Sequence, residues 1–119
     1  MSIELHHERD NIFRVRISGA LRARDLSDCA AQLLNDVERI GPVRLLFVLD
    51  TFEGWSNDDD WRDLSFYVKH GDAIERIAIV GDEQWRDLAL MFAAADLRKA
   101  PVEYFAPQGV SDALVWLSR

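Results

Sequence analysis

The run from Val43 to Leu49, VRLLFVL, is the feature that most constrains the fold, because every residue in it except Arg44 is apolar. The run does not alternate between apolar and polar residues, as a strand with one solvent-exposed face does. A strand of this kind is buried on both faces, which is typical of a parallel or mixed sheet covered by helices on both sides. We therefore expect this strand at the centre of an α/β domain.

Two strand patterns precede the central run. Ile3–His7 is a short segment that we expect to pair as an edge strand. Ile12–Ile17 alternates apolar side chains with arginines, and this period of two predicts a half-buried strand. An Asp-Asn pair, which is good turn chemistry, lies between the two segments. We predict an amino-terminal hairpin whose second strand ends at Gly19.

The rest of the chain alternates helix and strand patterns. Apolar residues recur at spacings of three and four over Leu26–Ile40, which predicts an amphipathic helix ended by Gly41 and Pro42. The same reasoning predicts, in chain order, a loop at Asp50–Ser56, a helix at Asn57–His70, a strand at Ile74–Val80, a helix from Trp85 to Ala95, a strand at Val102–Phe105 and a last helix from Ser111.

Alternation of this kind produces right-handed parallel crossovers with helices on the faces of the sheet. We expect a single α/β domain over residues 1–119, with a mixed sheet of about five strands and about four helices. The sheet would consist of the amino-terminal hairpin followed by parallel strands.

The charge of the chain excludes several partners. The formal charge is −7, from 14 Lys plus Arg against 21 Asp plus Glu, whereas nucleic-acid binding needs a cationic surface. The same balance argues against purely electrostatic docking on an anionic membrane.

Cys29 is the only cysteine, so we expect a buried, inert thiol and no disulfide. With no apolar stretch that resembles a signal peptide or a transmembrane helix, we expect a cytoplasmic protein.

The polar residues do not form a pattern that specifies a reaction. Acidic side chains follow the strand ends, but their spacing matches no calcium loop, and Asp58, Asp59 and Asp60 are explained as the first turn of a helix. The three histidines form no recognisable nucleophile–base arrangement with Thr51 or Ser56. We therefore expect no metal, no cofactor and no enzymatic activity.

Aromatic residues crowd the predicted loop and the helix after it: Phe52, Trp55, Trp61, Phe66 and Tyr67. Packing in the core is the simplest interpretation, because aromatic side chains dominate protein cores. A single helix, however, turns only part of its circumference toward a sheet. The surplus predicts an apolar groove, a partner surface or a movable lid.

Several motifs resemble the SpoIIAA-like family. They are LLFVLDTFEGW (Leu45–Trp55), Trp61 with Asp63, Lys69 with His70, IERIAIVGDEQW (Ile74–Trp85), Tyr104 with Phe105, and the residues from Ala113 to Leu117. The family comprises small bacterial proteins with the STAS fold, which is similar to CRAL-TRIO lipid-binding domains. The resemblance covers nearly the full chain, and it implies a STAS-type mixed sheet and a non-enzymatic role.

One element of the wider fold departs from its usual pattern in this chain. Anti-anti-sigma members carry a phosphorylatable Ser just after an Asp, at the start of the helix that follows the central strand. The corresponding place here reads Ser56, Asn57 and Asp58, without an Asp-Ser pair. Thr51 does follow Asp50, but at the end of the strand. This difference weighs against the phosphorylation switch of the family.

Two functional hypotheses remain. The first is a module that binds a small hydrophobic or lipid-like ligand and contacts membranes reversibly. Its ligand-binding or lid residues would be Phe52, Gly54, Trp55, Trp61, Phe66 and Tyr67. The second is a STAS-type regulatory domain that docks on another protein through the same loop and helix, with phosphorylation at Thr51 or Ser56 as its switch. Homodimerisation is compatible with either.

Overall fold

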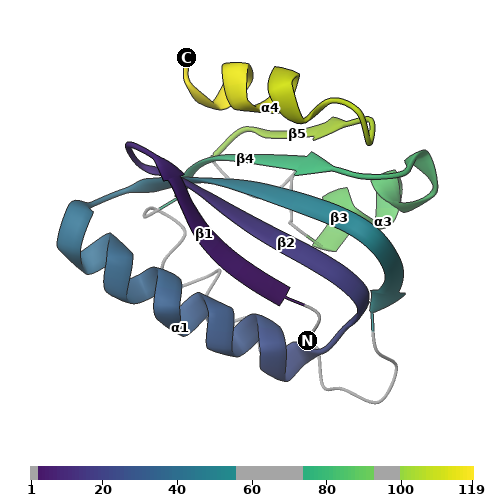
Figure 1. The fold of residues 1–119 in the computed structure, drawn as a ribbon, viewed down its shortest axis with the longest axis horizontal. Helices are drawn as coiled ribbons and strands as arrows, with labels where there is room; N and C mark the ends of the chain where they lie inside the picture. Colours follow the sequence, from purple (N-terminus) through teal and green to yellow (C-terminus); the bar gives the residue numbers. More distant parts are fainter. Residues whose placement is uncertain (1–2, 56–73, 93–99) are drawn as a thin grey trace.

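Five strands form a single mixed sheet in the computed structural model, which describes residues 3–55, 74–92 and 100–119. The strands lie side by side in chain order (Figure 1): β1 (Ile3–Arg9), β2 (Ile12–Leu21), β3 (Val43–Trp55), β4 (Ile74–Val80) and β5 (Val102–Phe105). β1 pairs with β2 in the antiparallel direction, and every later pair is parallel. The predicted amino-terminal hairpin followed by parallel strands is confirmed.

The described residues form three α-helices, namely α1 (Ala23–Ile40), α3 (Arg86–Phe92) and α4 (Val110–Leu117), where the sequence predicted about four helices in the whole chain. α1 begins at Ala23 rather than at Leu26, and it ends as predicted, where the Gly41 amide donates a hydrogen bond to the Val37 carbonyl at 2.7 Å. A 3-10 turn, η2 (Glu83–Trp85), precedes α3, so the helix starts one residue after Trp85. The predicted helix at Asn57–His70 lies outside the described residues.

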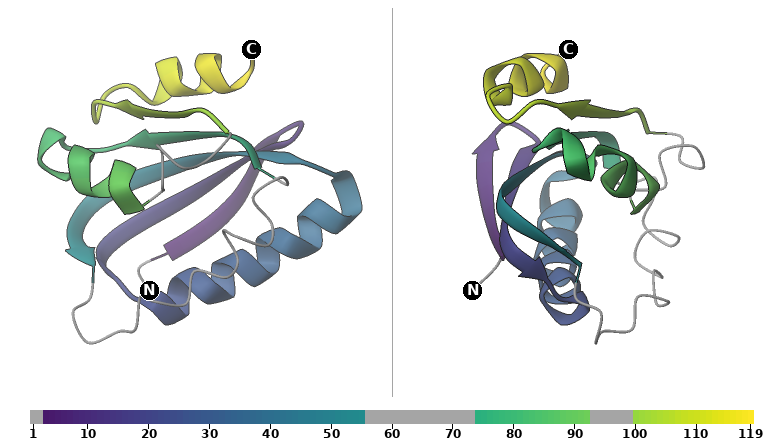
Figure 2. Two further views of the ribbon diagram at one scale, coloured as in Figure 1. Left: turned by 180° about the vertical axis from the view of Figure 1, so that it is seen from behind. Right: turned by 90° about the vertical axis from the view of Figure 1, so that its right-hand side faces the viewer.

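The helices cover both faces of the sheet, with α1 and α3 on one side and α4 on the other (Figures 1 and 2). The core under α1 and α3 includes Phe13, Leu33, Leu45, Ile77 and Ala89. The core under α4 consists of Ile12, Leu46, Ala78, Val80, Ala113 and Leu117. Leu45 and Leu46 are neighbours in β3 and are both fully buried, one in each core. The central strand is therefore covered on both faces, as its apolar run predicted.

Two predicted strand ends were wrong. β2 does not end at Gly19 but continues to Leu21, and the predicted loop at Asp50–Ser56 is strand as far as Trp55. Both extensions belong to one parallel ladder, in which Gly19 pairs with Phe52 and Leu21 with Trp55. These segments contain glycine and a mixture of polar and aromatic residues, which suggested a loop. The pairing of β2 with β3 is irregular here, so the segments lack the period of two that identifies a strand.

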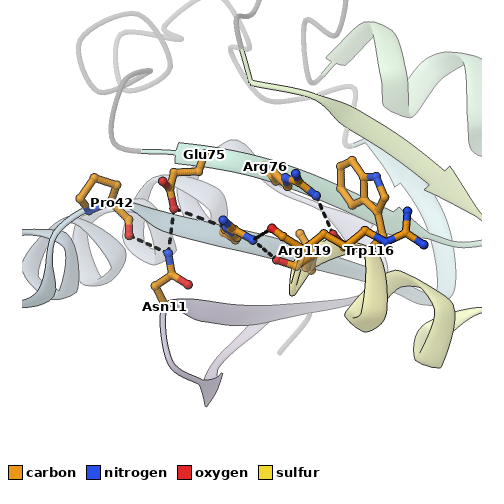
Figure 3. A network of polar contacts seen from close by, with 8 residues as sticks. Asn11, Pro42, Glu75, Arg76, Trp116 and Arg119 are labelled. Atoms are coloured by element: carbon orange, nitrogen blue, oxygen red, sulfur yellow. Dashed lines mark hydrogen bonds and ion pairs between the residues drawn. The ribbon is translucent and has the colours of Figure 1, made fainter.

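Two arginines at the amino ends of β3 and β4 hold the last turn of α4. Arg44 donates hydrogen bonds through Nη1 to the carbonyl oxygens of Leu117 and Arg119, the latter at 2.8 Å. Arg76, the neighbour of Arg44 across the ladder, donates to the Trp116 carbonyl at 2.7 Å, and its guanidinium lies 5.2 Å from the centre of the Trp116 ring (Figure 3). Carbonyls at the end of a helix have no partner within the helix, so these contacts satisfy them and fix α4 on the sheet.

The same end of the sheet joins the β1–β2 turn to the rest of the molecule. The Asn11 amide nitrogen donates to Glu75 Oε1 at 2.9 Å and to the Pro42 carbonyl at 3.1 Å (Figure 3). Glu75 Oε1 also accepts a hydrogen bond from Arg44 Nε at 3.4 Å. A continuous polar network therefore connects the β1–β2 turn, the amino ends of β3 and β4 and the carboxyl end of α4.

Cys29 lies on the buried side of α1, as the sequence predicted. Burial raises the pKa of its thiol to about 11, which keeps it protonated at neutral pH. Among the described helices, none combines the length and the apolar character that crossing a bilayer requires.

Candidate functional site

The carboxyl-terminal half of β3 contains two irregularities in its pairing with β2. The paired residues there are Leu49–Ile17, Phe52–Gly19 and Trp55–Leu21, so each step of two residues along β2 is matched by three along β3. An extra residue on one strand is a β-bulge, which bends the strand and increases its twist. Thr51 and Gly54 lie within these steps, and both have positive φ angles, of 51° and 98°.

The bulges decide which side chains of β3 face inward. With strict alternation, Thr51 and Glu53 would follow Leu49 on the face under α1 and α3. The extra residues instead place Phe52 and Trp55 there, where both pack with Leu49 in one apolar cluster, while Thr51 and Glu53 are exposed. Two left-handed residues therefore convert a mixed polar and aromatic segment into an apolar wall.

A cavity of about 40 Å³ lies against this wall. Its lining comes from β2, β3, β4 and both helices of this face: Ile17, Leu21, Leu26, Phe47, Leu49, Phe52, Trp55, Ile77, Ile79 and Ala89. All of these side chains are aliphatic or aromatic. A buried water needs two to four polar partners, so a space with such a lining favours an apolar occupant.

Three aromatic rings close the end of the wall. The Phe52 ring lies edge to face with Trp55 and with Trp85, at centroid distances of 5.1 and 5.0 Å, and the two indoles are 6.2 Å apart. These distances and near-perpendicular angles are those that aromatic pairs prefer. Gly54 allows the arrangement, because a Cβ atom at this position would come within 3.2 Å of Trp85 Cη2. We call Phe52, Trp55 and Trp85 the aromatic cluster.

The structure brings together three of the residues predicted for ligand binding. Phe52 and Trp55 line the cavity, and Gly54 lies beneath Trp85. The other three predicted residues, Trp61, Phe66 and Tyr67, lie outside the described residues, as does Ser56. From the sequence, Trp85 was predicted at the start of a helix, and its place in the aromatic cluster was not predicted. No local pattern in the sequence indicates this place, because Trp85 meets Phe52 and Trp55 only in the folded chain.

Thr51, the other candidate for phosphorylation, lies away from the cavity. It lines a polar hollow with Ser18, Gly19, Ala20, Arg22, Asp25 and Glu53. Its hydroxyl is exposed and donates a hydrogen bond to the Asp50 carbonyl at 2.6 Å. The Asp50 carboxylate in turn accepts a hydrogen bond from Arg16 Nε at 3.1 Å, and this bond and the charge of Asp50 raise the pKa of Arg16.

A phenol on β5 packs against the apolar core of this face. Tyr104 donates a hydrogen bond to the Asp82 carbonyl at 2.6 Å. Burial, together with the charges of Asp82 and Glu83, raises the pKa of Tyr104 to about 12, so the phenol remains neutral. Within the described ranges, the His, Cys, Asp and Glu side chains form no group of three or more that could hold a metal ion. An apolar cavity walled by aromatic and aliphatic side chains is the geometry of a site for a small apolar molecule.

Comparison with known proteins agrees with this architecture. The model of the SpoIIAA-like family matches residues 12–118. A search of the curated proteins finds no match. Among solved structures, the chain is similar to an uncharacterised protein of the DUF3478 family with a SpoIIAA-like fold, from Shewanella loihica PV-4. The two are 24% identical with a TM-score of 0.74, over 98% of this chain and 92% of the other, which supports the fold.

Proposed function

The chain belongs to the SpoIIAA-like family, and from this premise we propose that it is a non-enzymatic binding module for a small apolar or lipid-like ligand. The observation that carries the proposal is the apolar cavity beside Phe52 and Trp55. The aromatic wall depends on two bulges in one strand and on a glycine that leaves room for an indole. Bulges commonly re-aim side chains next to functional sites.

The energetics favour an apolar ligand at this position. Burial of apolar surface contributes about 25 cal/mol for each Å² removed from water. Trp55 is only half-buried, so a ligand that covers it removes both its own surface and part of the indole from water. The walls on the sheet are held by backbone pairing, so little ordering is required of them on binding.

We also propose that the ligand is exchanged at a neutral membrane surface. α3 exposes Leu88 and Met91, at 45% and 71% of their surface, close to Ala89 in the cavity wall. Exposed apolar side chains beside a binding site suit contact with lipid, while the charge of −7 disfavours anionic headgroups. Sedimentation with phosphatidylcholine vesicles tests this: Met91→Glu should reduce binding, and Val115→Glu, on the opposite side of the sheet, should not.

Native mass spectrometry after gentle purification tests the ligand itself. We expect a co-purified apolar compound, which is lost in Trp55→Ala. Calorimetric titration with 1-hexanol should show affinity reduced by about tenfold or more in that variant. Trp116→Ala is the matched control, because Trp116 packs with Phe105 on the α4 side. A clean apo mass together with no heat from any alkanol would contradict the proposal.

A second candidate, a regulatory domain that docks on a protein partner, is favoured by one observation. Thr51 presents an exposed hydroxyl on a left-handed residue, in a hollow that also contains Arg22. A phosphate there would have a guanidinium within the same hollow. Phosphopeptide mapping of protein purified from its native source would detect modification at Thr51. Pull-downs with Thr51→Glu and Thr51→Ala should then recover different partners, and identical recoveries would exclude the switch.

A further inference from the structure

We propose that Trp85 sets the upper size limit of the ligand, an inference that rests on the proposed function and concerns the same cavity. Trp85 does not line the cavity itself. It packs behind the two aromatic side chains that do, Phe52 and Trp55, and holds them in their present positions. The favoured ligands are therefore small uncharged apolar molecules, and longer chains require Trp85 to move.

The volume of the cavity limits the size of its occupant. A space of about 150 Å³ in a protein interior accepts benzene. The cavity here measures about 40 Å³, so it accepts only a few carbon atoms without rearrangement. Any larger ligand has to displace part of the wall.

Most of the wall cannot be displaced cheaply. Ile17, Phe47, Leu49, Ile77 and Ile79 belong to paired positions of β2, β3 and β4, where movement would break the backbone ladder. Leu26 is held by α1, which has 18 residues. Buried elements that are packed and paired in this way respond to strain as a unit.

The aromatic end of the wall can be displaced more easily, because Trp85, which supports it, lies in a short segment. Trp85 is the last residue of η2, a turn of three residues whose N-cap residue, Asp82, makes no side-chain cap hydrogen bond. The Trp85 amide donates one hydrogen bond, to the Asp82 carbonyl at 3.1 Å. The hydrogen-bond geometry of a 3-10 turn is poorer than that of an α-helix, so this segment holds the indole less firmly than paired strands hold the rest of the wall. Displacement of this indole would let the Phe52 and Trp55 side chains change rotamer, while their backbones stay paired with Gly19 and Leu21.

The contact with Gly54 shows how closely the indole is seated. A Cβ atom at position 54 would lie 3.2 Å from Cη2 and 3.4 Å from Cζ3 of Trp85. The ring therefore rests directly on the backbone of the second bulge. The position of the Trp85 ring therefore depends on the backbone of β3 at Gly54. For this reason we assign the size limit of the cavity to Trp85.

Binding of n-alkanols of increasing length, from 1-butanol to 1-dodecanol, tests the inference by calorimetry. In the wild-type protein we expect affinity to stop rising beyond a short chain. Trp85→Ala should extend the rise to longer chains and strengthen binding of 1-dodecanol by about tenfold or more. Trp85→Phe, which keeps a ring at this position, should retain the limit of the wild type. Urea unfolding establishes that each variant is folded, and Trp85→Leu replaces the alanine variant if that one is not.

Leu26→Ala is the matched control, because it removes a large side chain from the α1 wall of the same cavity. If this variant extends the limit as far as Trp85→Ala does, the effect is only one of volume and the inference is overturned. A Trp85→Ala protein that keeps the wild-type limit overturns it as well, while the proposed function stands. A wild-type protein that binds no alkanol of any length overturns the proposed function itself.

Discussion

The two faces of the sheet are packed to different degrees. On the α4 face, Leu46, Ala78, Ala113 and Leu117 have no exposed surface at all. On the face under α1 and α3, the carboxyl end of the sheet keeps a cavity, and Trp55 stays half-buried beside it. Both faces draw on the same central strand, so the difference does not come from a lack of apolar residues.

The two ends of β3 show the same contrast in their polar contacts. At the amino end, Arg44 and its neighbour Arg76 satisfy carbonyls of α4 and fasten that helix. At the carboxyl end, bulges replace regular pairing and turn Phe52 and Trp55 toward the cavity. One strand therefore holds α4 with its first half and lines a cavity with its second half. Substitutions along it should separate the two roles.

The largest expected effect is on the α4 face. Leu46→Ala removes a fully buried side chain and should lower the free energy of unfolding by about 3 kcal/mol or more. Leu49→Ala, in the cavity wall, should cost about half as much, because Leu49 is only partly buried and already borders empty space. Urea unfolding of both variants measures the difference. Equal losses would mean that the two faces are equally well packed.

The next effect concerns the amino end of β3. Arg44→Met keeps the length of the side chain but leaves two carbonyls of the α4 end without their donor, and should cost about 2 kcal/mol. Arg39→Met is the control, since Arg39 is 67% exposed and pairs with Asp36 across one turn of α1, so its loss should cost about 0.5 kcal/mol or less. Hydrogen exchange in Arg44→Met should accelerate chiefly in the last turn of α4. Uniform acceleration of hydrogen exchange across the sheet would contradict the view that Arg44 stabilises chiefly the last turn of α4.

At the carboxyl end, alanine substitutions of two glycines distinguish the cost of backbone strain from the cost of a clash with the aromatic cluster. Gly41 and Gly54 have similar positive φ angles, 94° and 98°, and alanine at either should cost about 1 kcal/mol. Only Gly54 lies against another side chain, whereas a Cβ atom on Gly41 meets nothing within 4 Å. Gly54→Ala should therefore cost about 0.5 kcal/mol more and shift the tryptophan emission, while Gly41→Ala leaves the emission unchanged. Identical spectra for the two variants would show that the ring is not seated on the backbone.

The sequence predicted the regular part of this molecule well. The apolar run at Val43–Leu49 predicted a central strand covered on both faces, because a strand buried on both faces consists almost entirely of apolar residues. The spacing of three and four in α1 and its stop at Gly41 are also local signals. Periodicity, capping and turn chemistry act over a few residues, so they can be recognised without knowledge of the fold.

The site was predicted only in part, because it depends on irregular pairing and on contacts across the sheet. Asp50–Ser56 was interpreted as a loop, since no period of two continues through the bulges at Thr51 and Gly54. The spacing of three from Leu49 to Phe52 and from there to Trp55 was the visible signal. Trp85 meets Phe52 only in the folded chain, so no local pattern could have joined them.

The smallest effect is a pH dependence at the same carboxyl end. The pKa of Tyr104 is raised from 10.0 to about 12, chiefly by burial, so the folded protein holds this proton more tightly than the unfolded chain does. Its contribution to stability is complete below pH 10 and is lost as the pH rises toward 12, because the unfolded state releases the proton first. Tyr104→Phe should flatten the fall in urea stability above pH 10. Cys29, with a pKa raised to about 11, titrates in an overlapping range, so the comparison is made in a Cys29→Ala background. An unchanged slope in Tyr104→Phe would show that the phenol beside the cavity is open to solvent, and that this face is more loosely packed than the contact with Asp82 indicates.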